Sequence, residues 1–276
     1  MSTAQPFLRW AGSKRQILPL LTRYWSSDYT RYIEPFAGSA CLFFRLQPKQ
    51  AILSDINGDL ISTYREIKHH VRRVASYLCK LEKGRDEYLA LREMDPSSLP
   101  PPARAARFIY LNRFCFNGLY RTNQAGYFNV PYGGDKAGNL PSCDALMACS
   151  AYLKGARLVA GDFQVPLKRA KQGDFVYLDP PFSVRSRRVF NEYNPASFGE
   201  ADILALRKWM EIMTDRRVAF LVSYAESDEA DFLRKGFYSE MVSVKRNIAG
   251  FSGSRVRANE MLISNRRPDI DKEASV

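Results

Sequence analysis

The most specific chemical signal in this sequence is the segment Asp179-Pro180-Pro181-Phe182. It follows residues 175–178, an apolar run that predicts a buried strand. Consecutive prolines donate no backbone hydrogen bond and keep the chain extended, so the Pro180 carbonyl can point into a cleft beside the Asp179 carboxylate. Two such acceptors can bind both hydrogens of an aromatic amino group, which localises the nitrogen lone pair for attack on a methyl group. Phe182 offers a face for a planar base, and the competing explanation is a rigid exit from strand to loop.

Two earlier turns have residue types that suit an adenosine-containing ligand. Residues 32–40 read Tyr-Ile-Glu-Pro-Phe-Ala-Gly-Ser-Ala, and their small side chains let a ligand approach the backbone at the end of a strand. This segment is not the GxGxxG fingerprint, and taken alone it is more often simply a turn. Asp55 ends the next predicted strand, where its carboxylate can accept hydrogen bonds from two ribose hydroxyls. The alternative for Asp55 is a helix N-cap, a role for which Asp59 competes.

Residues 111–133 interleave arginine, asparagine and aromatic side chains across a helix end and a glycine-containing hairpin. Arginine can read guanine, asparagine can pair with adenine, and apolar groups can contact a thymine methyl. Aromatic side chains can also enter the stack beside a displaced base. Composition alone would favour an aromatic-rich core hairpin instead. Two basic segments, residues 185–188 and the pair Arg255 and Arg257 in a late hairpin loop, suit phosphate contacts and a solvated surface equally well.

The charge balance favours a polyanionic partner. The chain has 41 Lys and Arg against 29 Asp and Glu, a net charge of +12, and neutralising phosphates releases counterions. A basic protein without a special partner is the alternative. The five cysteines form no CxxC pair, and the only histidines are adjacent (His69 and His70), so we expect neither a zinc site nor a disulfide framework. The sequence shows no secretory signal and no apolar span of membrane length, which predicts a soluble intracellular protein.

Short apolar runs alternate with longer amphipathic stretches along the chain. This alternation predicts an α/β fold, a mostly parallel sheet with helices on both faces. The predicted strands are residues 32–33, 51–53, 157–160, 175–178 and 218–222, and the predicted helices include residues 14–24, 59–81 and 201–213. Residues 239–245 and 259–264 predict an antiparallel hairpin at the sheet edge.

One segment interrupts the alternation. Residues 71–150 contain helical patterns at 85–94 and 103–116, a proline-rich joint at 100–102 and a hairpin-like stretch at 124–132, but no buried parallel strand. We therefore predict a discontinuous catalytic and cofactor-binding domain, residues 1–70 and 151–276, and an inserted target-recognition domain, residues 71–150.

In order and over nearly the whole chain, these motifs resemble the Dam-type DNA adenine-N6 methyltransferases. Residues 7–14 look like the family's opening cofactor motif, 34–38 its glycine motif, 55–60 its ribose-binding turn, 161–163 its adenine-binding corner and 179–182 its catalytic tetrapeptide. The tetrapeptide usually ends in Tyr. Phe182 keeps the stacking surface and loses only a hydroxyl.

The resemblance implies a Rossmann-like S-adenosylmethionine-dependent methyltransferase that needs no metal and acts on an adenine flipped out of double-stranded DNA. The catalytic residues would be Asp179, Pro180, Pro181 and Phe182. The residues implied to bind or neighbour the cofactor are Trp10, Lys14, Glu34, Phe36, Ala37, Gly38, Ser39, Asp55, Asp162, Phe163 and Asp179.

The resemblance also assigns roles in DNA recognition. Arg121 would contact a base, Leu119 and Pro131 a thymine methyl, and Phe116 or Asn117 the gap left by the adenine. Family members with such a hairpin commonly recognise GATC. The full set of candidate DNA contacts is Arg9, Phe116, Asn117, Leu119, Arg121, Asn123, Asn129, Pro131, Arg185, Arg187 and Arg188.

Two alternatives stay open at this point. The acceptor could be a cytosine N4 amino group or an RNA base, because the tetrapeptide suits any planar amine. The chain could also be a catalytically inactive, sequence-specific DNA-binding protein, although the intact tetrapeptide and cofactor motifs argue against that. The expected location is the cytoplasm, on the nucleoid through DNA binding. A cognate restriction endonuclease would be a partner in function only.

Overall fold

The computed structural model describes residues 5–134, 138–181, 198–247 and 255–269, with backbone only for 244–247 and 255–258. Its seven-stranded sheet has the order β3-β2-β1-β4-β5-β7-β6. β1, β4 and β5 run parallel to one another, and β7 is antiparallel to both β5 and β6. The strands are β1 (Arg31–Glu34), β2 (Ala51–Asp55), β3 (Ala156–Ala160), β4 (Asp174–Leu178), β5 (Ala219–Ala225), β6 (Tyr238–Asn247) and β7 (Arg255–Ser264).

Every strand predicted from the sequence overlaps one of these strands, with 218–222 beginning one residue before β5, so the mixed α/β architecture is confirmed. The reason is visible in the burial of the central strands. All five residues of β4 and the first six of β5 are buried, which requires cover on both faces of the sheet. Such strands are continuous apolar runs in the sequence, and they are too short to form buried helices.

The chain divides into two compact units, which are described separately. The first unit comprises residues 1–15, 37–49 and 53–161, and the second comprises residues 16–36, 50–52 and 162–276. The first unit has the helices α2 (Cys41–Leu46), α3 (Gly58–Leu78), α4 (Arg85–Glu93), α5 (Pro101–Phe114) and α6 (Cys143–Leu153), with 3₁₀ turns η2 (Pro96–Ser98) and η3 (Phe116–Gly118). The second has α1 (Leu18–Thr22), α7 (Gln164–Leu167), α8 (Glu200–Asp215) and α9 (Asp228–Arg234), and the 3₁₀ turn η1 (Arg15–Ile17) lies at the junction.

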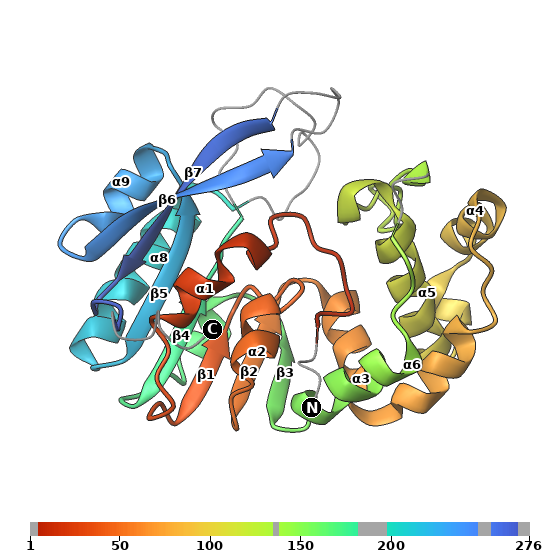
Figure 1. The fold of residues 1–276 in the computed structure, drawn as a ribbon, viewed down its shortest axis with the longest axis horizontal. Helices are drawn as coiled ribbons and strands as arrows, with labels where there is room; N and C mark the ends of the chain where they lie inside the picture. The colour runs from red at the N-terminus through yellow and green to blue at the C-terminus, as the bar shows by residue number, and fades with distance from the viewer. Residues whose placement is uncertain (1–4, 135–137, 182–197, 248–254, 270–276) are drawn as a thin grey trace. The chain divides into compact units, whose positions relative to one another are not determined.

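In the first unit, α5 packs on α3 and α4, and α3 packs on α6 and β3 (Figure 1). The proline-rich joint begins α5, because a proline at the first helical position lacks only an N–H that has no partner in the helix. α5 presents the buried side chain of Arg107, which donates to the carbonyls of Leu91 and Arg92 at the end of α4. These bonds satisfy helix C-terminal acceptors. The helices of this unit are therefore joined by polar contacts as well as by apolar packing.

In the second unit, α8 packs on β5 and α9 packs on β7 (Figure 1). The long antiparallel pair β6–β7 continues the sheet beyond β5. Its register pairs Lys245 with Arg257 and Asn247 with Arg255. The expectation that Arg255 and Arg257 lie in the late hairpin loop is therefore wrong, because the ladder extends through both and leaves residues 248–254 between the strands.

Two further local expectations need adjustment. The cap of α3 is Asn57, whose side chain accepts from Leu60 N, so neither Asp55 nor Asp59 fills that role. The hairpin-like stretch begins earlier than residue 124, because isolated bridges pair Cys115 with Tyr132 and Thr122 with Phe128. The predicted inserted domain, residues 71–150, begins just after His70, where the backbone of α3 has non-helical angles. Its predicted end at residue 150 falls inside α6. The division into catalytic and recognition domains stays a prediction.

Candidate active site

The carboxylate of Asp179 lies directly after β4, at the carboxyl end of a buried parallel strand. It is half-buried, Pro180 is buried and Pro181 is exposed. Asp179 Oδ1 accepts a hydrogen bond of 2.9 Å from Ser223 Oγ on β5. The side chain is thus held by the neighbouring strand while part of it stays accessible, as the predicted catalytic role requires.

The sheet changes direction beside this carboxylate. β1 and β4 are adjacent and parallel, and successive connections leave from them toward opposite edges of the sheet. Open α/β sheets bind ligands outside the carboxyl ends of strands at such a switch point. Glu34 ends β1 and is buried. Two acidic residues of the prediction, Glu34 and Asp179, therefore end the two strands that form the switch.

In the first unit, Asp55 is held by the turn that carries Gly38. Its Oδ2 accepts from Gly38 N at 3.0 Å and its Oδ1 from Asn57 N at 2.9 Å. Burial raises the pKa of the Asp55 carboxyl, and the backbone N–H groups of Asn57, Gly38 and Ile56 oppose that rise. A carboxylate has about four acceptor positions, so Asp55 can still accept from a hydroxyl beside these backbone groups.

The turn around Gly38 is fixed from several directions. A Cβ added at Gly38 would lie 2.8 Å from Trp10 Cδ1, and the backbone has φ +46°. The Gly38 carbonyl accepts from Tyr64 Oη at 2.9 Å, and Ala37 N donates to the Ser54 carbonyl. Only glycine permits this approach of the Trp10 ring to the backbone. The structure thus brings together four residues predicted to bind the cofactor: Trp10, Ala37, Gly38 and Asp55.

Two other residues predicted to bind the cofactor lie near the same turn. Lys14 is buried and its Nζ donates to the Gly12 carbonyl at 3.3 Å. Ser39 is buried, and its hydroxyl lies 3.4 Å from that of Ser13. Both side chains therefore lie within the N-terminal motif and the glycine turn.

In the second unit, three phenylalanines form an aromatic group. Phe36 and Phe163 are stacked, with centroids 5.3 Å apart, and Phe198 packs against both. Asp162 is exposed and accepts from Gln164 N at the start of α7. The sequence predicted Phe36 and Phe163 and missed Phe198, because nothing in its local sequence distinguishes it from an ordinary apolar residue before a helix.

The predicted DNA-reading residues lie on a hairpin, residues 115–132, called here the recognition hairpin. Phe116 and Leu119 are 41% and 40% exposed, which is unusual for large apolar side chains and leaves them accessible to a partner. Arg121 is exposed, and its Nε donates to Asn129 Oδ1 at 2.8 Å and its Nη2 to the Asn129 carbonyl at 3.3 Å. Asn129 therefore orients the guanidinium fork.

The other predicted residues of the recognition hairpin are Asn117, Asn123 and Pro131. Asn123 Oδ1 accepts from Ala125 N and Tyr127 N, which closes the turn at the tip. Asn117 is exposed with φ +54°, and Pro131 is exposed. The structure thus uses Asn123 to hold the turn, while Asn117 and Pro131 present their side chains to the surroundings.

Arg9 is joined to the base of this hairpin within the first unit. Its backbone N–H donates to Asn112 Oδ1 at 2.8 Å, and its carbonyl accepts from Asn112 Nδ2 at 2.5 Å. A Cβ added at Gly118 would lie 2.9 Å from Arg9 Cβ.

Burial lowers the pKa of Arg113, and the charges of Arg9 and Arg15 lower it further. These clustered cations favour an anion such as a phosphate.

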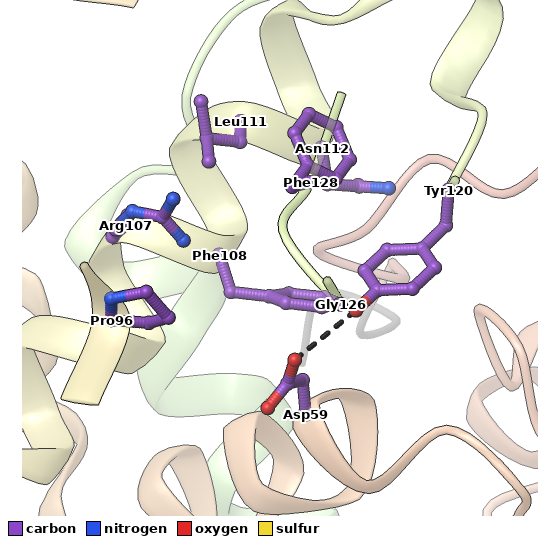
Figure 2. Close-up of a pocket in the computed structure, with 9 residues that line it drawn as sticks. All are labelled: Asp59, Pro96, Arg107, Phe108, Leu111, Asn112, Tyr120, Gly126 and Phe128. Carbon is purple, nitrogen blue, oxygen red and sulfur yellow. Dashed lines mark hydrogen bonds between the residues drawn. The ribbon is translucent and has the colours of Figure 1, made fainter. Parts of the chain in front are cut away.

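Tyr120 connects the recognition hairpin to Trp10, which lies against the turn around Gly38. The sequence analysis missed this residue. Its ring stacks on Trp10 with centroids 6.0 Å apart. Its hydroxyl donates to Asp59 Oδ2 at 3.1 Å, as Figure 2 shows. The pocket beside it is lined by Asp59, Pro96, Arg107, Phe108, Leu111, Asn112, Tyr120, Gly126 and Phe128. Its cavity volume of about 30 Å³ is far below the size of a nucleoside site, so these side chains serve packing.

Four predicted residues lie outside the described residues: Phe182 of the tetrapeptide, and Arg185, Arg187 and Arg188 after it. Within the described ranges, no group of three or more His, Cys, Asp or Glu side chains could hold a metal ion. In the same ranges, no helix is long and apolar enough to cross a membrane.

A family model described as D12 class N6 adenine-specific DNA methyltransferase matches residues 10–248. The chain belongs to this family. Type II methyltransferase M1.LlaDCHI of Lactococcus lactis subsp. cremoris is 33% identical over 270 residues, covering 95% of each chain. Type II methyltransferase M.MjaIII of Methanocaldococcus jannaschii is 35% identical over 272 residues, covering 88% of this chain and 92% of the relative. DNA adenine methylase of Escherichia coli K12 is 30% identical over 271 residues, covering 95% of each chain.

Membership of the D12 class confirms the resemblance found in the sequence. The protein is an adenine-specific DNA methyltransferase, and the family implies S-adenosylmethionine as methyl donor and DNA as the molecule acted on. Neither a cytosine or RNA acceptor nor an inactive DNA-binding protein agrees with this family.

Proposed function

We propose that this D12-class enzyme methylates the N6 amino group of an adenine flipped out of duplex DNA, within the sequence GATC. The observation that carries the chemical part is the half-buried Asp179 carboxylate, held at the carboxyl end of β4 by Ser223. A carboxylate fixed there can accept a hydrogen bond from an amino group brought into the site. An amino group inside a stacked base pair cannot reach such a strand end, so the base must leave the duplex.

The residues present fit S-adenosylmethionine. In the first unit, the Asp55 carboxylate can still accept from a ribose hydroxyl, and Gly38 keeps the backbone beside it accessible. In the second unit, the aromatic group of Phe36 and Phe163 offers a surface for an adenine ring. We assign the ribose to Asp55 and the adenine to Phe163, with Lys14, Glu34, Ser39 and Asp162 as neighbours. S-adenosylmethionine supplies an electrophilic methyl group when it is bound.

The protein's own contribution is orientation and activation of the amine. The Asp179 carboxylate and the Pro180 carbonyl each accept a hydrogen bond from the amino group. The nitrogen lone pair is then directed away from these two acceptors. Methylation of an amino group releases one proton. Asp179 can accept that proton and pass it to water, because the side chain is half-buried rather than enclosed. Phe182 would stack on the flipped base.

We propose that the recognition hairpin reads the sequence. Arg121, oriented by Asn129, would donate both hydrogen bonds to a guanine. The exposed Leu119 and Pro131 would contact a thymine methyl, and the exposed Phe116 or Asn117 would fill the gap left by the adenine. Arg9 and Arg113 would contact phosphates, which relieves the repulsion between their charges. The division into a catalytic domain and an inserted recognition domain, residues 71–150, belongs to this proposal.

The decisive experiment is to incubate a plasmid of known sequence with the enzyme and S-adenosylmethionine and to map every methylated base. The expected result is N6-methyladenine at every GATC and at few other adenines. Methylation at another adenine-containing sequence would refute GATC and leave the mechanism intact. An absence of N6-methyladenine in DNA, with the protein folded, would refute the proposed reaction.

A further inference from the structure

We infer that Ser223 and Tyr177 are positioning residues for the proposed catalytic carboxylate, Asp179. The inference rests on the proposed function, since it assumes that Asp179 binds the target amine. Asp179 Oδ1 accepts from Ser223 Oγ at 2.9 Å, and Ser223 Oγ lies 2.9 Å from the hydroxyl of Tyr177. The three side chains thus form a short row of hydrogen bonds that ends on the reacting group.

The direction of the row follows from the chemistry of its members. An ionised carboxylate only accepts hydrogen bonds, so Ser223 must use its single proton toward Asp179. The Ser223 oxygen can then only accept from Tyr177, which is the donor at the far end. The hydrogen bond from Tyr177 polarises the Ser223 hydroxyl. The polarised hydroxyl is then a stronger donor to the Asp179 carboxylate.

The strand register explains why these residues meet. β4 and β5 are parallel, and their ladder pairs Leu178 with Val222, so Asp179 and Ser223 come next on each strand. Side chains two apart on a strand point to the same face, which places Tyr177 on the face of Asp179. β5 is held on its other side by β7, where Ser223 pairs with Leu262. Ser223 is therefore fixed between two strands and cannot move away from the carboxylate.

Burial makes the hydroxyls of this row more than incidental. Ser223 is 0% exposed and Tyr177 1% exposed, in strands that are otherwise apolar over the same stretch. Placing two hydroxyls in such surroundings destabilises the fold unless each has a hydrogen-bond partner. Asp179 satisfies Ser223, and Ser223 satisfies Tyr177. Both hydroxyls are therefore paired inside the sheet, in a row that ends on Asp179.

Two consequences for catalysis follow. A hydroxyl donating to a carboxylate favours its ionised form, and the bond fixes the side-chain rotamer that faces the amine. The row therefore keeps Asp179 ionised and correctly oriented while a base enters. Glu34, at the end of β1 on the other side of β4, is another acidic residue beside this strand end, and every variant below retains it.

The test compares Ser223→Ala with the wild type in single-turnover methyl transfer from pH 4 to pH 9. We expect the rate constant of methyl transfer to fall about ten- to a hundredfold because the carboxylate loses its orientation, with the dissociation constant for DNA unchanged. We also expect the acid limb of the pH profile to move upward by about one pH unit, the effect of losing one hydrogen bond to a charged group. Tyr177→Phe should shift the acid limb in the same direction by less. Ser223→Thr, which retains the hydroxyl, should restore the wild-type limb.

Ser264→Ala is the matched control. Ser264 is a buried serine on the adjacent strand β7, and its hydroxyl donates to the Phe220 carbonyl at 2.6 Å rather than to a carboxylate. This variant should lower the temperature of unfolding and leave the acid limb in place. If Ser264→Ala moves the limb as far as Ser223→Ala does, the shift reflects general loosening of the sheet and the inference is wrong.

A direct measurement separates this inference from the proposed function. Carbon-13 NMR of carboxyl-labelled enzyme gives the pKa of Asp179, whose signal is assigned by its loss in Asp179→Asn. Ser223→Ala should raise that pKa, and an unchanged value together with an unchanged pH profile would overturn the inference. If Asp179→Asn itself methylates DNA normally, the proposed function fails instead. Should Ser223→Ala not fold, Tyr177→Phe decides the question by the same two readouts.

Discussion

The end of β4 and the recognition hairpin hold their functional side chains in opposite ways. Asp179 is fixed by Ser223 from a neighbouring strand, 44 residues away in the sequence, inside a buried part of the sheet. Arg121 is fixed by Asn129, eight residues away, on an exposed hairpin with only isolated bridges. The first arrangement is tertiary and buried, and the second is local and exposed.

The difference matches what the proposed function requires of each region. A reacting group needs one geometry, and packed strands restrict movement to a fraction of an ångström. A hairpin that reads bases must meet a partner whose shape differs from one sequence to the next, so accessible side chains on a local turn suit it better. Phe116 and Leu119 are exposed there, as the proposed contacts with DNA require.

The largest expected effect comes from the buried region. Asp179→Asn should lower the rate constant of methyl transfer by about a thousandfold or more, because the amine loses a charged acceptor fixed in place. The dissociation constant for DNA should change little. Single-turnover methyl transfer and fluorescence anisotropy with a labelled duplex measure the two quantities. Asp231→Asn, which removes an exposed carboxylate paired with Arg234 on α9, is the control and should retain full activity.

A smaller and different effect is expected from the hairpin. Arg121→Ala should reduce the preference for the cognate duplex over one with a changed guanine by about 1–3 kcal/mol, the value of one bidentate base contact. Competition binding with duplexes that differ at a single base pair measures it. A uniform loss for all duplexes, with a lower salt dependence, would instead make Arg121 a phosphate contact.

Asn129→Ala should have a similar but weaker effect. It removes the partner that orients Arg121 and leaves the guanidinium present, so we expect a loss of about 0.5–1.5 kcal/mol in the same discrimination. The double variant Arg121→Ala/Asn129→Ala should be no worse than Arg121→Ala alone. Additive losses in this cycle would show that Asn129 contacts DNA independently, and the comparison between local and tertiary support would then need revision.

The smallest expected effect concerns Asp55, a second carboxylate at a strand end whose partners are backbone N–H groups. Burial raises its pKa in the folded protein, so neutral Asp55 stabilises the fold below pH about 4, and that contribution is lost as the pH rises through the folded pKa. The free energy of unfolding of the wild type relative to Asp55→Asn should therefore fall as the pH rises above about 4. Urea unfolding over a pH series measures it, and a difference that grows with pH would contradict the assigned direction.

Local sequence was sufficient for the strands and for most of the helices. Residues 175–178 and 218–222 are apolar runs because both faces of β4 and β5 are covered, and the sequence shows this directly. The hairpin at the sheet edge was shorter in the prediction than in the structure, because Arg255 and Arg257 are polar residues whose strand conformation depends on pairing with β6. Asn57 was overlooked as a cap because three candidate caps stand within five residues, Asp55, Asn57 and Asp59.

The sequence by itself determined the family and the order of the motifs, and it predicted the acceptor and donor groups, because each motif is a short run whose residue types limit its chemistry. The tertiary structure alone decided which side chains support them: Ser223 and Tyr177 for Asp179, and Tyr120 for Trp10. Those partners are distant in sequence or belong to another element. Their meeting depends on the register between strands and on the packing of the hairpin, neither of which a local pattern encodes.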